Sequence, residues 1–266
     1  MGQPWAIRLA RAVPCATIDI MPTPFMHMAL ARRLIADPYL PPTSRDRVQS
    51  AWGAFLLGSV APDARISSGL DRANTHFFEY GPVIDPSPVD AMLNRYSELR
   101  GSAIQDGTRA VFMAGYAAHL AMDAVWATEI LYPYFIQGKA GTTRTRYVLL
   151  HMLLGYLDRR DRARLTDGEY LALSSAVPDH WLPFVADQGL AEWRDAIASQ
   201  IAPGAPSRTL DILSQRMRIN TSELAALLDS ESQMALLWSV VSPSQVASVE
   251  EAMYDGTRRE VINYLG

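Results

Sequence analysis

The chain has little cysteine, little clustered positive charge and no long uncharged apolar segment. Its single cysteine, Cys15, excludes an internal disulfide and fits a reducing compartment, so we expect a cytoplasmic protein. The net charge is −4 and no lysine- or arginine-rich run occurs, so strong attraction to nucleic acid or to an anionic membrane is not expected. No window reaches the ~18 uncharged apolar residues of a membrane span, which leaves only transient membrane contact open.

The motifs of several common enzyme classes are also absent. The sequence has no Walker-type phosphate loop, no Gly-x-Gly-x-x-Gly and no Gly-x-Ser-x-Gly, which argues against P-loop, dinucleotide-binding and α/β-hydrolase chemistry. Valine and isoleucine never alternate over a strand-length segment, so we predict an all-α fold. The 49% apolar and 20% charged residues are typical of a soluble globular protein.

The N-terminal residues differ from the remainder of the sequence. Residues 1–20 lack a continuous apolar core of signal-peptide length, and the segment from Met21 reads as a natural chain start. We therefore expect residues 1–20 to be a dispensable extension or an artefact of start-site choice. Residues 21–266 are expected to form one compact helical bundle, with the metal motifs in 21–160 and a helical C-terminal part in 161–266.

The hydrophobic periodicity predicts one helix after another. Ser44 is expected to cap a helix that stops at Gly58, Pro133 to lie just past the end of a central apolar helix, and the charged run 158–164 to be a solvated helix end. A loop at 59–65 and an irregular segment at 66–88 separate these helices. The main expected helices cover residues 26–37, 44–58, 88–100, 106–132, 143–165 and 243–264.

Histidine is scarce, with 5 in 266 residues, yet one lies four residues before an aspartate in the most apolar segment. His119 and Asp123 would point from one face of a helix otherwise built of Ala, Leu, Met, Val and Trp. A buried carboxylate must be paired or bound to a metal, and zinc accepts imidazole nitrogen together with carboxylate oxygen. A His–Asp pair that satisfies itself without a metal remains the alternative for these two residues taken alone.

Four short motifs in order resemble the zinc-dependent phospholipase C family, over about residues 21–160. The likeness is closest to the intracellular branch, whose chains begin a few residues before the first histidine. The resemblance implies a single compact bundle of helices with three metals in a cleft. The motifs are Pro24-Phe25-Met26-His27, Gly58-Ser59-Val60-Ala61-Pro62-Asp63, Thr75-His76-Phe77-Phe78 and His119-x-x-x-Asp123.

The resemblance also implies which residues hold each metal. One zinc would take Asp63, His76, His119 and Asp123, and Asp123 would bridge to a second zinc that also takes His27. In secreted members the free amino-terminal residue ligates this second metal. Here that ligand would require a chain that starts at residue 21 and then exposes the amine of residue 22.

The third metal is where the sequence departs from the family. The family's histidine six residues after the bridging aspartate is Glu129 here. The later His-x-x-x-Glu keeps its histidine as His151 but has Gly155 in place of the carboxylate. Glu129 and His151 could still hold a metal weakly, with Asp158 as a further candidate, or Glu129 could be an ordinary acid at a helix end. We therefore expect two zinc ions and a weakened third position.

By this resemblance the protein is a zinc-dependent phosphodiester hydrolase that cleaves a phospholipid headgroup ester or a small phosphodiester, with Asp63 orienting or deprotonating the attacking water. Two alternatives stay open. Related zinc nucleases with a similar ligand order cut single-stranded nucleic acid, although the negative charge speaks against that substrate. The missing carboxylate at position 155 instead favours a non-catalytic helical metal-binding or interaction module.

Overall fold

The structure is a computed structural model and describes residues 20–266. Every regular element in these residues is helical, which confirms the all-α prediction. Cys15 and the expected extension lie outside the described residues, apart from Ile20, so the division of the chain near residue 20 stays a prediction.

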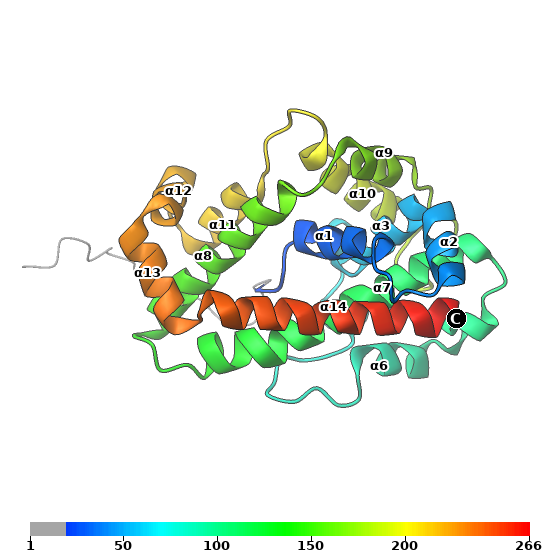
Figure 1. Cartoon of the computed structure of the whole chain (residues 1–266), viewed down its shortest axis with the longest axis horizontal. Helices are drawn as coiled ribbons and strands as arrows, with labels where there is room; N and C mark the ends of the chain where they lie inside the picture. The colour runs from blue at the N-terminus through cyan, green and yellow to red at the C-terminus, as the bar shows by residue number, and fades with distance from the viewer. Residues whose placement is uncertain (1–19) are drawn as a thin grey trace, which may run out of the picture.

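The helices are mostly short and follow one another with brief connections (Figure 1). Three of them, α7, α8 and α14, are long. In chain order the elements are α1 Pro24–Ile35, α2 Pro42–Ser50, α3 Trp52–Val60, η2 Ala61–Ala64, α4 Arg65–Ser68, α5 Ala73–His76, α6 Pro88–Arg95, η3 Ser97–Leu99, η4 Gly101–Ala103, α7 Gly107–Trp126, η5 Ala127–Ile136, α8 Thr143–Arg162, α9 Asp167–Ser175, α10 Asp187–Ile201, α11 Thr209–Met217, α12 Thr221–Asp229, α13 Glu231–Val240 and α14 Pro243–Leu265.

Helix α7 is the central element, and it makes its most extensive contacts with α3 and α14 (Figure 1). Two glycines allow α3 and α7 to touch backbone to backbone. A Cβ at Gly58 would lie 2.0 Å from the Phe112 carbonyl oxygen, and one at Gly115 would lie 2.4 Å from that of Phe55. Gly58 is therefore a packing residue inside α3, and the expectation that it ends a helix is wrong.

The expected helix 44–58 is two helices that meet at Ala51, whose φ of −130° and ψ of 41° are not helical. Pro42 fits the first turn of α2, because proline lacks the N–H that is unpaired there, so the helix begins before Ser44. Ser44 is buried inside α2 and is not its cap. The break lets Gly53 approach the backbone of α9, where a Cβ would meet the Ala172 carbonyl oxygen at 2.2 Å.

Two other expectations about helix ends are corrected by packing. Pro133 does not stop the central helix, which continues beyond α7 as the π-helical η5; the wider turn accommodates a proline that an α-helix interior would reject. The charged end of α8 is not fully solvated, since Asp158 and Asp161 are each 1% exposed. Arg160 pairs with both Asp161 and Glu250, which joins α8 to α14.

One helical stretch in the described residues, Gly107–Ile136, is long and apolar enough to cross a membrane by length and composition. In the structure 83% of its most apolar window is buried against other helices. Its apolar character is therefore accounted for by its place in the core.

We predict that Gly115→Ala will destabilise the fold, whereas Gly256→Ala will not. The new methyl group at position 115 would collide with α3 backbone, and overpacking of this kind costs about 1–3 kcal/mol. At Gly256 in α14 the nearest neighbour of a Cβ would be Ala121 Cβ at 3.6 Å, an ordinary contact, so alanine should change stability by less than about 1 kcal/mol or raise it. Denaturant unfolding of both variants and the parent measures the difference. Equal stabilities for the two variants would contradict the close α3–α7 contact.

Candidate metal site and adjoining pocket

Five residues expected at the metal site lie together, although four separate elements carry them. His27 comes from α1, Asp63 from η2 and His76 from α5, while His119 and Asp123 come from successive turns of α7. Asp63 follows α3 directly, so the glycine-mediated contact of α3 with α7 brings it to His119. The side chains of these residues are buried, with Asp63 the most exposed at 13%.

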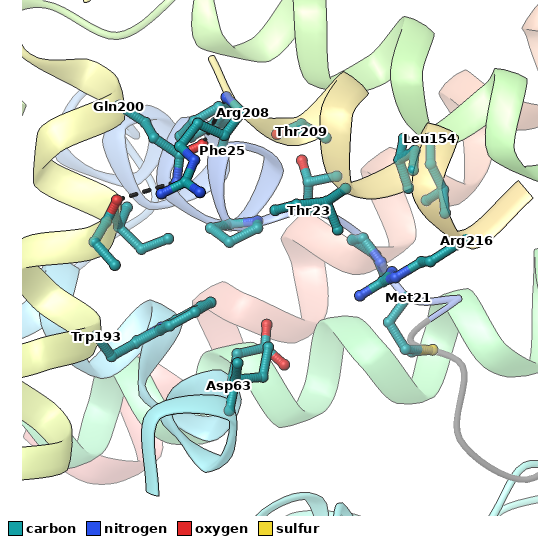
Figure 2. Close-up of a pocket in the computed structure, with 17 residues that line it drawn as sticks. Met21, Thr23, Phe25, Asp63, Leu154, Trp193, Gln200, Arg208, Thr209 and Arg216 are labelled. Carbon is teal, nitrogen blue, oxygen red and sulfur yellow. Dashed lines mark hydrogen bonds between the residues drawn. The ribbon is translucent and has the colours of Figure 1, made fainter. Parts of the chain in front are cut away.

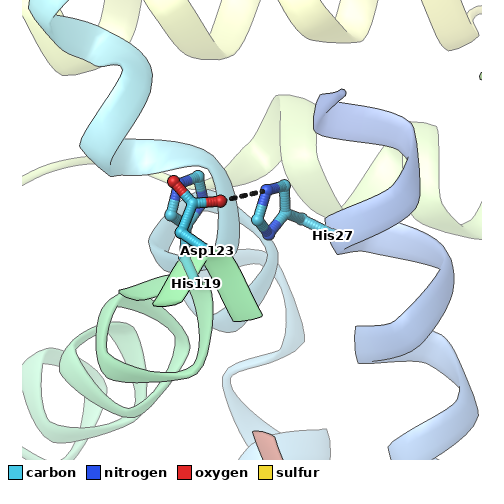
Figure 3. A group of neighbouring side chains, drawn as sticks. All are labelled: His27, His119 and Asp123. Atoms are coloured by element: carbon cyan, nitrogen blue, oxygen red, sulfur yellow. Dashed lines mark ion pairs between the residues drawn. The ribbon is translucent and has the colours of Figure 1, made fainter. Parts of the chain in front are cut away.

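Asp123 lies at the centre of the group. Its Oδ2 is 3.5 Å from His76 Nε2 and 3.6 Å from His119 Nε2, whereas its Oδ1 is 3.5 Å from His27 Nε2 (Figure 3). His76 Nε2 is also 3.5 Å from Asp63 Oδ1. The two carboxylate oxygens of Asp123 therefore face different imidazoles, which is the arrangement a bridging ligand needs.

These spacings fit zinc. Around a tetrahedral zinc with bonds of about 2.0–2.2 Å, neighbouring ligand atoms lie about 3.3–3.6 Å apart. Three contacts fall in that range. His76 Nε2 lies 3.5 Å from an oxygen of Asp63 and 3.5 Å from one of Asp123, and His119 Nε2 lies 3.6 Å from Asp123. Two groups of three residues could each hold a metal, because one ligand atom from each member lies within 4.8 Å of the others. We call these groups the ligand sets; they are His27–His119–Asp123 and Asp63–His76–His119.

Several ligand atoms are buried and lack any hydrogen-bond partner. They are both ring nitrogens of His27, Nε2 of His76, Nε2 of His119 and Oδ1 of Asp123. Buried polar atoms in folded proteins are almost always hydrogen-bonded, so such a concentration of unsatisfied atoms needs an explanation. Bound cations would satisfy the three Nε2 atoms and Asp123 Oδ1, and the donor set of imidazole and carboxylate fits zinc. One imidazole offers only one ring nitrogen to a given cation, so His27 Nδ1 is not accounted for in this way.

Neighbouring groups fix the orientation of two imidazoles. His119 Nδ1–H donates to the Ser59 carbonyl oxygen at 2.8 Å, which leaves the lone pair on Nε2 facing Asp123. Thr75 Oγ1 donates to the Arg72 carbonyl oxygen and lies 3.0 Å from His76 Nδ1, so this hydroxyl accepts the ring N–H of His76. Outer hydrogen bonds of this kind select the tautomer that a metal requires.

The charges in the site agree with this interpretation. Burial alone would raise the pKa of Asp123, but the charge of His119 and the close imidazoles of His119 and His27 hold that pKa well below its usual value. Burial lowers the pKa of His27 and of His76, which keeps both imidazoles neutral and able to ligate. His119 has a raised pKa because Asp123 outweighs its burial, so a metal must displace its proton.

Arg72 also contacts this site, although none of the four sequence motifs includes it. Its Nη2 donates to Asp123 Oδ2 at 3.3 Å. The spacing could have indicated this contact, because Arg72 lies four residues before His76 and the two side chains can share one face of a short helix.

Glu129 and His151 belong to neither ligand set in residues 20–266. Glu129 is exposed on η5. His151, on α8, donates from Nδ1 to the Tyr147 carbonyl oxygen at 2.8 Å, and its buried Nε2 has no hydrogen-bond partner. A Cβ at Gly155 would meet Leu228 and Leu210 side chains at 3.2 and 3.3 Å, so leucines occupy the place of the carboxylate that the family has there. A third metal held by these residues stays a prediction.

Asp158, the further candidate for that third metal, is hydrogen-bonded to protein groups instead. Its Oδ1 accepts from Thr209 Oγ1 at 3.0 Å and its Oδ2 from Ser207 Oγ at 3.4 Å. The carboxylate therefore ties α8 to the start of α11.

A cavity of about 260 Å³ opens beside the ligand groups, and Asp63 lines it. Its wall is mainly apolar, with Leu154 from α8 and Trp193 from α10 among its residues. Figure 2 shows the side chains of Asp63 and Arg216 pointing into this space from opposite elements, η2 and α11. Arg208 lines it as well. The sequence placed the cleft walls only in broad ranges, because contacts between distant helices create them.

The comparison with known families agrees with this geometry. Residues 26–127 match the model of a family described as zinc dependent phospholipase C. Over these residues the chain is similar to the zinc-dependent phospholipase C family. The match includes His27, Asp63, His76, His119 and Asp123, and it ends before Glu129 and His151. No curated protein and no solved structure matches the chain.

We predict that zinc will stabilise the protein through this site. Because the ligands converge only in the folded state, zinc at about 100 times its Kd should add about 2.7 kcal/mol, which corresponds to a rise in Tm of roughly 5–10 °C. The rise should vanish in His119→Ala and persist in His180→Ala, since His180 is an exposed histidine paired with Asp187. Thermal unfolding with zinc and with a chelator measures it. An equal rise in His119→Ala would place the zinc elsewhere.

We predict that the buried Asp158 makes the folding stability depend on pH in a way that is absent from Asp158→Asn. Burial raises its pKa from 3.8 to about 6, despite hydrogen bonds from neighbouring hydroxyls. The folded state therefore holds this proton more tightly than the unfolded state. Folding stability should fall as pH rises from about 4 to 6, by up to about 3 kcal/mol, and then level off.

Unfolding free energies of wild type and Asp158→Asn between pH 4 and 7 isolate this contribution, because other groups cancel in the difference. A difference that does not change with pH would show that Asp158 is ionised throughout.

Proposed function

We propose that the protein is a metal-dependent phosphodiester hydrolase with phospholipase C-like activity. The match of residues 26–127 to the zinc-dependent phospholipase C family supports the general chemistry. The buried, unsatisfied His and Asp atoms support a metal centre within the same residues. The substrate class we propose is a phosphodiester that carries an apolar group, such as a phospholipid headgroup ester.

One observation carries the proposal: Asp63 belongs to a ligand set and also lines the cavity. It is the only one of the five clustered residues in the cavity wall among the described residues. A substrate phosphate in the cavity would therefore meet the metal centre at Asp63. Water bound there would lie between the carboxylate and the phosphate.

The residues have separable roles in this proposal. His76, His119 and Asp123 would hold the metal, and His27 would face the second oxygen of Asp123. When bound, zinc neutralises phosphate charge and lowers the pKa of a coordinated water toward ~7. Burial raises the pKa of Asp63, but the close imidazole of His76 and the charge of His119 lower it to about 2. An Asp63 carboxylate that stays ionised accepts a hydrogen bond from the attacking water and orients it.

The cavity wall favours an amphiphilic substrate over nucleic acid. Leu154, Trp193 and other apolar side chains provide a surface for hydrocarbon, and Arg208 and Arg216 also line the cavity. Nucleic-acid binding without sequence preference instead needs a basic groove with stacking aromatics. The net charge of −4 gives no support for such a groove.

We predict zinc-dependent hydrolysis of bis-p-nitrophenyl phosphate and of a phosphatidylcholine analogue. Asp123→Asn should lower kcat/KM by at least about 100-fold, because an amide keeps one oxygen and loses the negative charge and the second oxygen that faces His27 or the pair His76 and His119. Asp63→Asn should also lower kcat, since the carboxylate that orients the water is gone. His180→Ala serves as the matched control and should keep wild-type rates. Rates are measured with added zinc and after chelation.

The same assay separates the alternatives. Faster cleavage of a single-stranded oligonucleotide than of either ester would favour a nuclease-like phosphodiesterase. Full activity in Asp123→Asn would remove this centre from the reaction. A zinc-loaded protein inactive on every phosphodiester would leave a non-catalytic metal-binding module.

A further inference from the structure

We propose that Arg72 is a positioning residue that fixes the Asp123 carboxylate with Oδ2 toward His76 and His119 and Oδ1 toward His27. The inference rests on the metal centre of the proposed function, and it concerns zinc binding and not turnover. It assigns a task to the one guanidinium that contacts the five clustered residues within the described part of the chain.

Four contacts hold the Arg72 side chain in place. Its Nη1 donates to the Phe78 carbonyl oxygen at 3.1 Å, and its Nη2 donates to Asp123 Oδ2 at 3.3 Å. The guanidinium carbon lies 4.3 Å from the centre of the Phe78 ring and 4.5 Å from that of the Tyr80 ring. A planar cation held by two aromatic faces and a carbonyl has little freedom, so it can hold the carboxylate in one orientation.

The position of Arg72 argues against direct contact with substrate. Its side chain is 16% exposed, and it does not line the cavity that contains Asp63. The contact with Asp123 is also on Oδ2, the oxygen that faces His76 and His119. Arg72 therefore acts through Asp123.

Orientation matters because the two oxygens of Asp123 face different groups. Oδ2 is near His76 and His119, and Oδ1 is near His27. The terminal torsion of an aspartate is broad, so an unrestrained carboxylate would sample orientations that lose the contacts of one oxygen or of the other. The hydrogen bond from Arg72 selects the orientation that serves both.

The positive charge of Arg72 and its positioning of Asp123 have opposite effects on zinc affinity. A cation beside the site repels zinc, so charge alone predicts that removing Arg72 would tighten zinc binding. Positioning predicts the reverse, because loss of a group that orients a ligand typically weakens metal affinity about 10–100-fold. The sign of the change in zinc affinity therefore distinguishes the two effects.

Two substitutions separate geometry from charge. Arg72→Gln removes the charge and the guanidinium, whereas Arg72→Lys keeps the charge but has no planar fork to contact Phe78 and Asp123 together. Arg258→Gln is the matched control. Arg258 also pairs with a buried carboxylate, through its Nη1 at 3.1 Å from Asp37 Oδ2, and lies 5.7 Å from the Tyr254 ring, but it belongs to α14 away from the ligands.

The experiment measures zinc affinity of the full chain without substrate, by competition with a chromophoric chelator, and follows unfolding of the zinc-free proteins in parallel. We expect affinity to fall about 10–100-fold in both Arg72→Gln and Arg72→Lys and to stay at the wild-type value in Arg258→Gln. Loss of stability without zinc is expected in both glutamine variants, because each leaves a buried carboxylate without its partner.

Wild-type or tighter zinc binding in Arg72→Lys or Arg72→Gln would overturn the proposal, as would wild-type protein that binds no zinc. Should Arg72→Gln not fold, Arg72→Lys decides the question alone. A wild type that binds zinc and hydrolyses no phosphodiester would refute the proposed function while leaving the role of Arg72 in place.

Discussion

The site depends on one buried negative charge, the carboxylate of Asp123, which is fully enclosed in the core. Removing a charge from water is costly unless opposite charge and hydrogen-bond donors replace the solvent. Arg72 and the histidines His27, His76 and His119 surround this carboxylate. Even so, Oδ1 and several imidazole nitrogens remain without hydrogen bonds, which is the feature that a cation would resolve.

The position of that carboxylate follows from the contact of α3 with α7. Gly58 and Gly115 remove the two side chains that would keep these helices apart. Close approach places the Ser59 carbonyl oxygen within 2.8 Å of His119 Nδ1 and delivers Asp63, just beyond α3, to the same centre. The packing of two apolar helices thus sets the spacing of ligands that are 60 residues apart in the chain.

The parts of the chain outside the family match supply the surroundings of the site. Residues 26–127 contain all five clustered residues, whereas α8, α10 and α11 supply Leu154, Trp193 and Arg216 to the wall of the cavity. This division gives a physical basis for the proposed function: the matched segment would provide general metal chemistry, and the helices that follow it would decide which phosphodiester fits. It also explains why the sequence does not indicate the substrate, because the residues that line the cavity come together only when distant helices pack.

The sequence by itself determined the helical class and indicated the five residues that cluster. The spacing of His119 and Asp123 on an apolar helix, and the order of the other motifs, already indicated the five residues that lie together. Local sequence did not determine where helices break or which charges are buried. The central helix continues past Pro133 as a π-helix, and Ala51 separates α2 from α3. Asp158 and Asp161 are buried.

Only the tertiary structure decided these features, as well as the role of Arg72 and the separation of His151 from the ligand sets. The physical reason is that spacing along a helix depends on fixed local geometry, whereas burial and contact depend on which distant helix packs against that face.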